Sequence, residues 1–137
     1  MTKKSISKTA KPTRKHVASG SEWEEKFAYS RAVAQGDWCF VSGTTGTNYE
    51  LGVMPEEAAQ QTRNAITTID GALRSCGFEM GHVVRVQYTV TNRKYIEQIQ
   101  PELQRAFGAI KPAATMIIAD LIEKDMKIEI EVTAYKG

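Results

Sequence analysis

The chain has 137 residues, 42% of them hydrophobic and 25% charged, which is the composition of a globular protein with one domain. No apolar segment approaches the ~20 residues that cross a bilayer, and no apolar core follows the basic N-terminus, so we expect neither a membrane span nor a secretory signal. Cys39 and Cys76 have no second cysteine or histidine at metal-ligand spacing. The sequence therefore predicts no disulfide scaffold, no structural metal site and a reducing, cytoplasmic compartment.

The net charge of +2 is unevenly distributed along the chain. Residues 1–15 contain six of the 18 basic side chains and no acidic one, which leaves 12 basic against 16 acidic groups in the rest. A basic groove for nucleic acid is therefore not expected on the folded body. We predict that residues 1–16 form a flexible basic tail, because a segment rich in Lys, Ser and Thr cannot bury enough apolar surface to order itself. An organelle import segment is the alternative for this tail.

We take residues 17–137 as the folded body. Its first half begins with patterns typical of strands. A first strand is expected near residues 16–19. Apolar runs at 32–34 and 38–42 flank Gly36-Asp37, a combination typical of a hairpin turn.

A long helix is predicted to begin at Pro55, which suits a first helical position, and to stop at Gly77, which can adopt the left-handed conformation. Small and apolar side chains recur between them at three- and four-residue spacing and include Cys76. This face is expected to pack closely on a sheet. Because Cys39 falls in a strand pattern, both cysteines are expected to be small core residues rather than reactive thiolates.

The second half adds three strands, at residues 83–91, 112–119 and 127–134, and a helix at 93–107. Pro101 removes a backbone donor within that helix, so a kink or a new helix start is expected there. The resulting order predicts an α+β fold in which two helices cover one face of a mixed sheet.

The other face of the sheet is expected to carry polar and apolar residues together. In the strand at 83–91, Val84 and Val86 are expected on the helix side and Arg85 on the open side. A sheet with one covered face either meets water or packs against another subunit. We therefore expect the chain to form oligomers.

No motif indicates a nucleophile with its base. His16 and His82 have no acidic, Ser or Cys partner near them in the sequence. The glycines in residues 42–46 are not followed by the Gly-Lys-Ser/Thr of a phosphate loop. A functional role for this segment and a plain turn or close backbone approach both stay open.

Glu129 and Glu131 are more informative, because they point the same way on a strand and place two carboxylates ~7 Å apart. Two interpretations stay open. The glutamates could pair with Arg85 across the sheet, or one of them could orient or deprotonate a water in an interface cleft.

Six segments taken together resemble the Rid (reactive intermediate deaminase) family, also called the YjgF or L-PSP endoribonuclease-like family. The segments are 29–33 (YSRAV), 40–46 (FVSGTTG), 61–63 (QTR), 83–86 (VVRV), 111–113 (KPA) and 128–131 (IEIE). The resemblance covers about residues 17–136. It implies a chorismate-mutase-like α+β fold, assembly as a homotrimer and small-molecule clefts between subunits. Members with deaminase activity hydrolyse imines and enamines to a keto acid and ammonia without a cofactor.

The resemblance also assigns residues to the cleft. Glu129 matches a glutamate that positions water, and Tyr29 matches a pocket tyrosine. Ser42 and Gly43 match a strand end that lines the ligand, and Gln100 lies where deaminase members carry Asn.

One position departs from the family pattern. In deaminase members an Arg after Pro-Ala binds the substrate carboxylate through two parallel hydrogen bonds, but this chain has Ala114 followed by Thr115. Loss of a charged partner weakens binding strongly, so activity on the usual 2-imino acids is not expected. Arg31, two residues after Tyr29, is the candidate substitute cation.

The first functional hypothesis is a trimeric, cofactor-free hydrolase of a reactive imine or enamine, with Glu129 acting on water. The alternative is a trimer that binds a small molecule for regulation without catalysis. A nuclease or translation inhibitor is disfavoured by the acidic body and by the lack of a metal site or histidine pair. The expected partners are other copies of the chain and a small molecule, with neither membrane nor nucleic acid.

Overall fold

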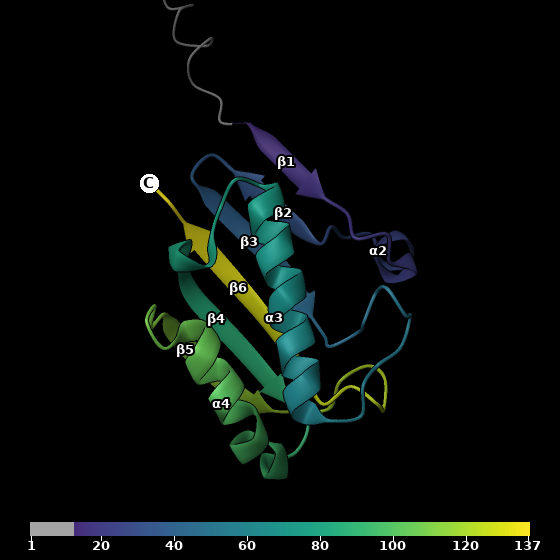
Figure 1. Cartoon of the computed structure of the whole chain (residues 1–137). Coiled ribbons are helices and arrows are strands. Elements are labelled where there is room, and N and C mark those ends of the chain that lie inside the picture. The colour runs from purple at the N-terminus through teal and green to yellow at the C-terminus, as the bar shows by residue number, and fades with distance from the viewer. Residues whose placement is uncertain (1–12) are drawn as a thin grey trace, which may run out of the picture.

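The computed structural model describes residues 13–137, which form one six-stranded sheet in the order β1-β2-β3-β6-β4-β5 (Figure 1). The strands are β1 (Arg14–Val17), β2 (Ala32–Gln35), β3 (Trp38–Thr44), β4 (Val83–Val90), β5 (Ala113–Ile118) and β6 (Ile128–Tyr135). Neighbouring strands are antiparallel except β4 and β5, which run parallel. The predicted mixed sheet is therefore confirmed.

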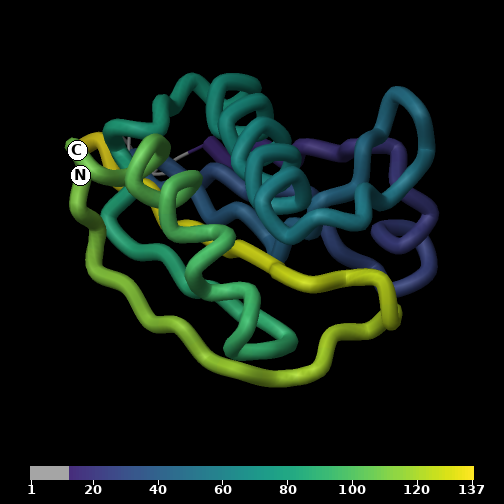
Figure 2. The backbone as a smooth tube through the Cα atoms, turned by 60° about the horizontal axis from the view of Figure 1, so that its bottom comes forward, coloured from purple at the N-terminus to yellow at the C-terminus, as the bar shows by residue number. Residues whose placement is uncertain are grey.

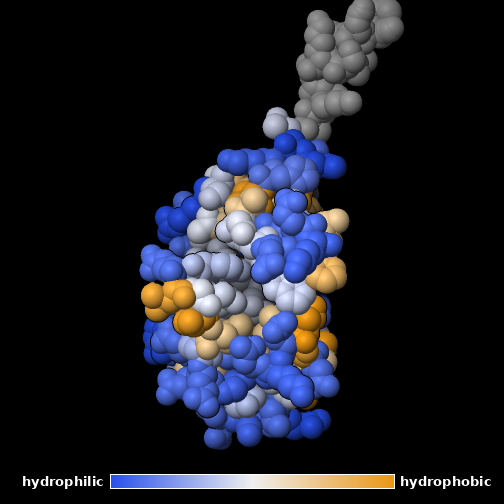
Figure 3. Space-filling model, turned by 90° about the vertical axis from the view of Figure 1, so that its right-hand side faces the viewer, coloured by the Kyte–Doolittle hydropathy of each residue, from blue (hydrophilic) through white to orange (hydrophobic). Residues whose placement is uncertain are grey.

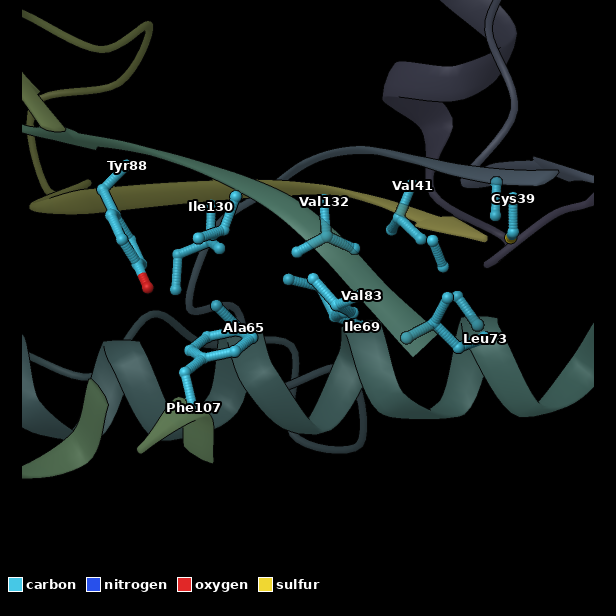
Figure 4. Packing of buried hydrophobic residues seen from close by; sticks show 14 of the residues in the cluster. Cys39, Val41, Ala65, Ile69, Leu73, Val83, Tyr88, Phe107, Ile130 and Val132 are labelled. Carbon is cyan, nitrogen blue, oxygen red and sulfur yellow. The ribbon is translucent and has the colours of Figure 1, made fainter. Parts of the chain in front are cut away.

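Two helices, α3 (Ala58–Ser75) and α4 (Ile96–Phe107), lie on the same face of this sheet (Figures 1 and 2). Buried residues of the helices, such as Ile69 and Phe107, point at buried strand residues such as Ile130 and Val132 (Figure 4). Neither of these two helices lies over the opposite face (Figure 2). The α+β prediction with two helices on one face is confirmed.

The alternation in β6 decides which of its side chains reach the core. The buried side chains are Ile128, Ile130, Val132 and Ala134. Successive residues of a strand point to opposite faces, so Glu129 and Glu131 lie on the open face, as predicted.

The hairpin between β2 and β3 and the long helix α3 follow the predicted pattern closely. Gln35 pairs with Trp38, and Gly36 between them has a positive φ of 57°, which a glycine adopts without steric cost. Helix α3 begins three residues after Pro55, and Gly77 follows its end with φ 80°. No described helix has the length and apolar character needed to span a membrane.

The short helix α2 (Glu22–Phe27) was not anticipated. Ser21 caps it by accepting a hydrogen bond from the Trp23 amide at 3.1 Å, and its first turn carries three glutamates. Acidic residues stabilise the positive end of the helix dipole. The cap signal was present in the sequence, but six residues are too few to show a helical period.

Three details differ from the sequence-based expectations. Strand β1 begins at Arg14, inside the predicted tail, because residues 14–17 pair with β2. The register shifts between Val83 and Arg85, so Val83 is buried and Val84 is exposed, not on the helix side. Helix α4 starts at Ile96 and runs through Pro101. Pro101 and its would-be acceptor Glu97 are both exposed, so water can satisfy the carbonyl.

The prediction of a flexible tail falls mostly on residues 1–12, which lie outside the described residues.

The two cysteines are distant in sequence but adjacent in the fold. Cys39 is completely buried and Cys76 is half-buried, and both thiols are free. Burial first, and then the neighbouring Cys76, raise the pKa of Cys39 to about 12. The prediction of an unreactive core residue is confirmed for Cys39.

Candidate functional site

A cavity of about 340 Å³ lies where α2 meets the end of β3 and the loops at residues 45–57 and 119–127. Its polar lining includes Tyr29, Arg31 and Glu129, with Gly43 between the last two. Figure 3 looks onto this side of the molecule, where apolar side chains flank a paler central region between hydrophilic ends. The structure therefore brings four of the eight predicted site residues into one hollow.

Glu129 reaches the cavity because it points to the open face between two buried isoleucines of β6. Its carboxyl group lies against Gly43, where an added Cβ would come within 2.7 Å of Cδ and 3.0 Å of both carboxylate oxygens. Only glycine leaves room for the carboxylate at this point. Burial raises the pKa of Glu129, the negative charge of Glu131 raises it further, and the cation of Arg31 opposes both.

Arg31 is held from both sides by backbone hydrogen bonds: its amide donates to Val17 O at 2.7 Å, and its carbonyl accepts from the Ser42 amide at 3.0 Å. The side chain is only 4% exposed and lines the cavity, and its Nη2 donates to Gly43 O at 2.6 Å. Nε is buried without a hydrogen-bond partner among the described residues. A buried cation with a free donor thus borders the same cavity as the Glu129 carboxylate.

Tyr29 sits at the end of α2, where its amide donates to Glu24 O at 3.1 Å. The Arg31 Cζ atom lies 5.8 Å from the centroid of its ring, within the range of a cation–π contact. The side chain is 39% exposed, so it forms part of the cavity rim. Burial raises the pKa of Tyr29, and Arg31 opposes that shift.

The other predicted site residues lie elsewhere in the single chain. Ser42 does not line the cavity, since its hydroxyl donates to Ser30 O at 2.7 Å. Gln100 and Ala114 line a separate groove of about 290 Å³ between α4 and β5. Thr115 accepts a hydrogen bond from Arg85 at 2.9 Å on the open face.

The structural interpretation of the two glutamates is wrong. Arg85 lies opposite Thr133, whereas Glu131 and Glu129 lie opposite Gln87 and Thr89. Within residues 13–137 Arg85 forms no ion pair with either glutamate. The regular register of β4 and β6 from Arg85 onward therefore sets the arginine two residues along the sheet from the nearer glutamate, Glu131.

Sequence reasoning missed the contribution of α2 and the loops. A second hollow of about 570 Å³ adjoins the first and shares with it Trp23, Met126 and three other lining residues. Trp23 stacks on Phe27 with ring centroids 5.3 Å apart, and both line this second hollow. The Ser21 cap and the acidic turn were the only signals for this wall. No three His, Cys, Asp or Glu side chains of the described residues group as metal ligands.

Comparisons with known proteins find relatives that match most of the chain. The family model described as Endoribonuclease L-PSP matches residues 21–136. An uncharacterized protein of Streptomyces coelicolor is 28% identical over 124 residues, which are 90% of this chain and 92% of the relative. The 2-iminobutanoate/2-iminopropanoate deaminase of Escherichia coli K12 is 24% identical over 111 residues, 79% of this chain and 87% of that protein.

A solved structure gives the same result. Rv2704 of Mycobacterium tuberculosis, described as a member of the highly conserved YjgF/YER057c/UK114 family, is 36% identical. It superimposes with a TM-score of 0.82, and the match covers 90% of this chain and 100% of that one.

Proposed function

Because the chain belongs to the Endoribonuclease L-PSP family, also called the YjgF or Rid family, we propose that it hydrolyses a reactive imine or enamine to a carbonyl compound and ammonia, without a cofactor. The observation that carries this proposal is the Glu129 carboxylate, half-buried on the wall of a cavity with a raised pKa. The Escherichia coli relative named as an imine deaminase supports the reaction class.

In the proposed reaction, water adds to the carbon of the C=N bond while Glu129 accepts the water proton. The carbinolamine formed in this way from the protonated imine takes that proton from Glu129 on nitrogen. The C–N bond then breaks, its electron pair leaves with ammonia, and the hydroxyl group gives its proton back to Glu129 as the carbonyl forms. One group must accept and then donate a proton, which is most efficient when its pKa lies near the working pH. The raised pKa of Glu129 moves the carboxyl group toward this condition. Tyr29, at the rim, covers the bound ligand.

We also propose that copies of the chain form a homotrimer through the open sheet face. Trp38 and Tyr135 on this face have ring centroids 4.5 Å apart, and Phe40 stacks beside Trp38 at 6.1 Å. All three are more than 40% exposed, and a contiguous exposed apolar patch is typical of an interaction surface. In an assembly, the groove with Gln100 and Ala114 of one subunit would complete a cleft with the Glu129 cavity of another. Size-exclusion chromatography with light scattering checks this, and a monomer at micromolar concentration would contradict it.

A second candidate, a non-catalytic binding trimer, is favoured by one observation. Among the described residues that line the groove with Ala114, the only charged one is Lys111, whose side chain is exposed. The usual anion contact of the deaminases is therefore missing from this groove. A protein with this groove could retain a ligand without turning it over.

Ammonia release from 2-aminoacrylate generated in situ separates the two functions. Hydrolysis predicts activity in the wild type, loss in Glu129→Gln, and retention in Glu97→Gln, which alters an exposed glutamate of α4. A silent wild type that gains activity in Ala114→Arg would instead favour the binding protein.

A further inference from the structure

We propose that Arg31 binds the carboxylate of the ligand in the Glu129 cavity and so supplies the anion contact that Ala114 cannot make. The inference rests on the proposed function and adds to it the residue that would hold the carboxylate of the ligand. It concerns a single subunit, since Arg31, Gly43 and Glu129 line one cavity of one chain.

The first support is the hydrogen-bonding state of the guanidinium group. Arginine carries five N–H donors and no acceptor. Among residues 13–137 the one side-chain hydrogen bond of Arg31 is that from Nη2 to Gly43 O, and Nε is buried with no partner. Buried polar groups in native proteins almost always have a partner. A carboxylate in the cavity would offer two oxygens to adjacent guanidinium donors, the geometry that arginine binds best.

The second support is charge. Arg31 is 4% exposed, yet no carboxylate of the described residues lies within ion-pair distance of it. Buried charges are normally paired. Glu129 acts on this cation electrostatically but from beyond ion-pair distance, so an acidic ligand would bring the carboxylate in direct contact that the described residues do not supply.

The third support is position. Gly43 accepts the hydrogen bond of Arg31 through its carbonyl, and the Glu129 carboxyl group packs against its Cα. The cation and the acid therefore flank the same residue. In a 2-imino acid the carboxylate is bonded directly to the carbon that water attacks. A ligand held by Arg31 through its carboxylate would thus present that carbon near Glu129.

Isothermal titration with 2-oxobutanoate and with its uncharged methyl ester tests the proposal. The wild type should bind the acid more tightly than the ester by about tenfold or more, the difference expected for a hydrogen-bonded charge pair. Arg31→Gln should reduce this ratio to about one, and Arg31→Lys should restore part of it because it keeps the charge. Arg74→Gln, at an exposed arginine of α3 on the other side of the sheet, should leave the ratio unchanged.

The ratio of the affinities for the acid and for the ester is insensitive to a general loss of stability. Melting curves of both Arg31 variants would report such a loss. Glu129→Gln should keep the preference for the acid even when ammonia release is lost, so binding and catalysis fail separately. The proposal is overturned if the wild type shows no preference for the acid, or if Arg31→Gln retains it.

Discussion

Gln61 ties helix α3 to the loop that leads into β6, and replacing it by leucine should loosen both. The side chain is completely buried. Its Nε2 donates to Pro55 O at 2.7 Å and Asp125 O at 2.9 Å, and its Oε1 accepts from the Lys127 amide at 2.8 Å. These three hydrogen bonds join α3 to Pro55 and to the loop at residues 125–127.

The size of the effect follows from the groups that leucine leaves unpaired. Leucine has a similar volume, so the main loss is hydrogen bonding rather than packing. Asp125 is exposed, so water can replace the bond to its carbonyl, but Pro55 and Lys127 are half-buried. Two such groups at ~1–3 kcal/mol each give an expected destabilisation of about 3 kcal/mol for Gln61→Leu. This is a large share of the ~5–15 kcal/mol that stabilise a typical domain.

Urea unfolding followed by tryptophan fluorescence measures this change. Gln61→Leu should lower the midpoint with an unchanged slope, and Tm should fall by about 10 °C for a chain of this size. Gln98→Leu, on the exposed surface of α4, is the matched control and should change stability by less than about 0.5 kcal/mol. Equal stabilities for the two variants would refute the role assigned to Gln61.

Three further predictions concern glycines and the cavity acid. Gly43→Ala places a methyl group 2.7 Å from the movable carboxyl end of Glu129, so ammonia release should fall at least about tenfold while stability drops by only about 1 kcal/mol. Gly46→Ala meets the backbone of Gln61 at 2.3 Å, which cannot move aside, so a loss of about 3 kcal/mol or more is expected in urea unfolding. The raised pKa of Glu129 means that the folded state holds its proton more tightly than the unfolded state does. The contribution of this group to stability is therefore complete below its pKa in the unfolded state and is lost as pH rises through its pKa in the folded state. Glu129→Gln, whose side chain does not ionise, should be more stable than wild type at neutral pH but not at pH 3.

The controls for these predictions are in the same chain. Gly71→Ala, on the exposed side of α3 with nothing within 4 Å of the added methyl, should raise stability by about 0.5–1 kcal/mol. Equal losses of stability in the Gly43 and Gly46 variants would contradict the difference between a movable and a fixed neighbour. A stability difference between Glu129→Gln and wild type that is independent of pH would show that the carboxyl group does not titrate as described.

The sequence could place Glu129 on the open face because a strand alternates strictly, whereas Tyr29 and Gly43 were assigned only by the resemblance to the Rid family. Glu129 lies between two aliphatic residues in the cleanest alternation of the chain, so its place on the open face followed from the period of two. The same rule failed for Val84, because a register shift is a property of two paired strands and leaves no mark on one of them. The glutamate pairing with Arg85 failed because the regular register of β4 against β6, which neither strand shows alone, sets Arg85 opposite Thr133.

The amino-acid sequence by itself determined the family, the α+β layering and the acid of the cavity, because these depend on periodicity and on local motifs. Only the tertiary structure decided where Arg31 points and that Gln100 and Ala114 border a different hollow from Glu129. Those relations join residues up to about a hundred positions apart, through strand register and loop packing. No pattern local to the chain contains them.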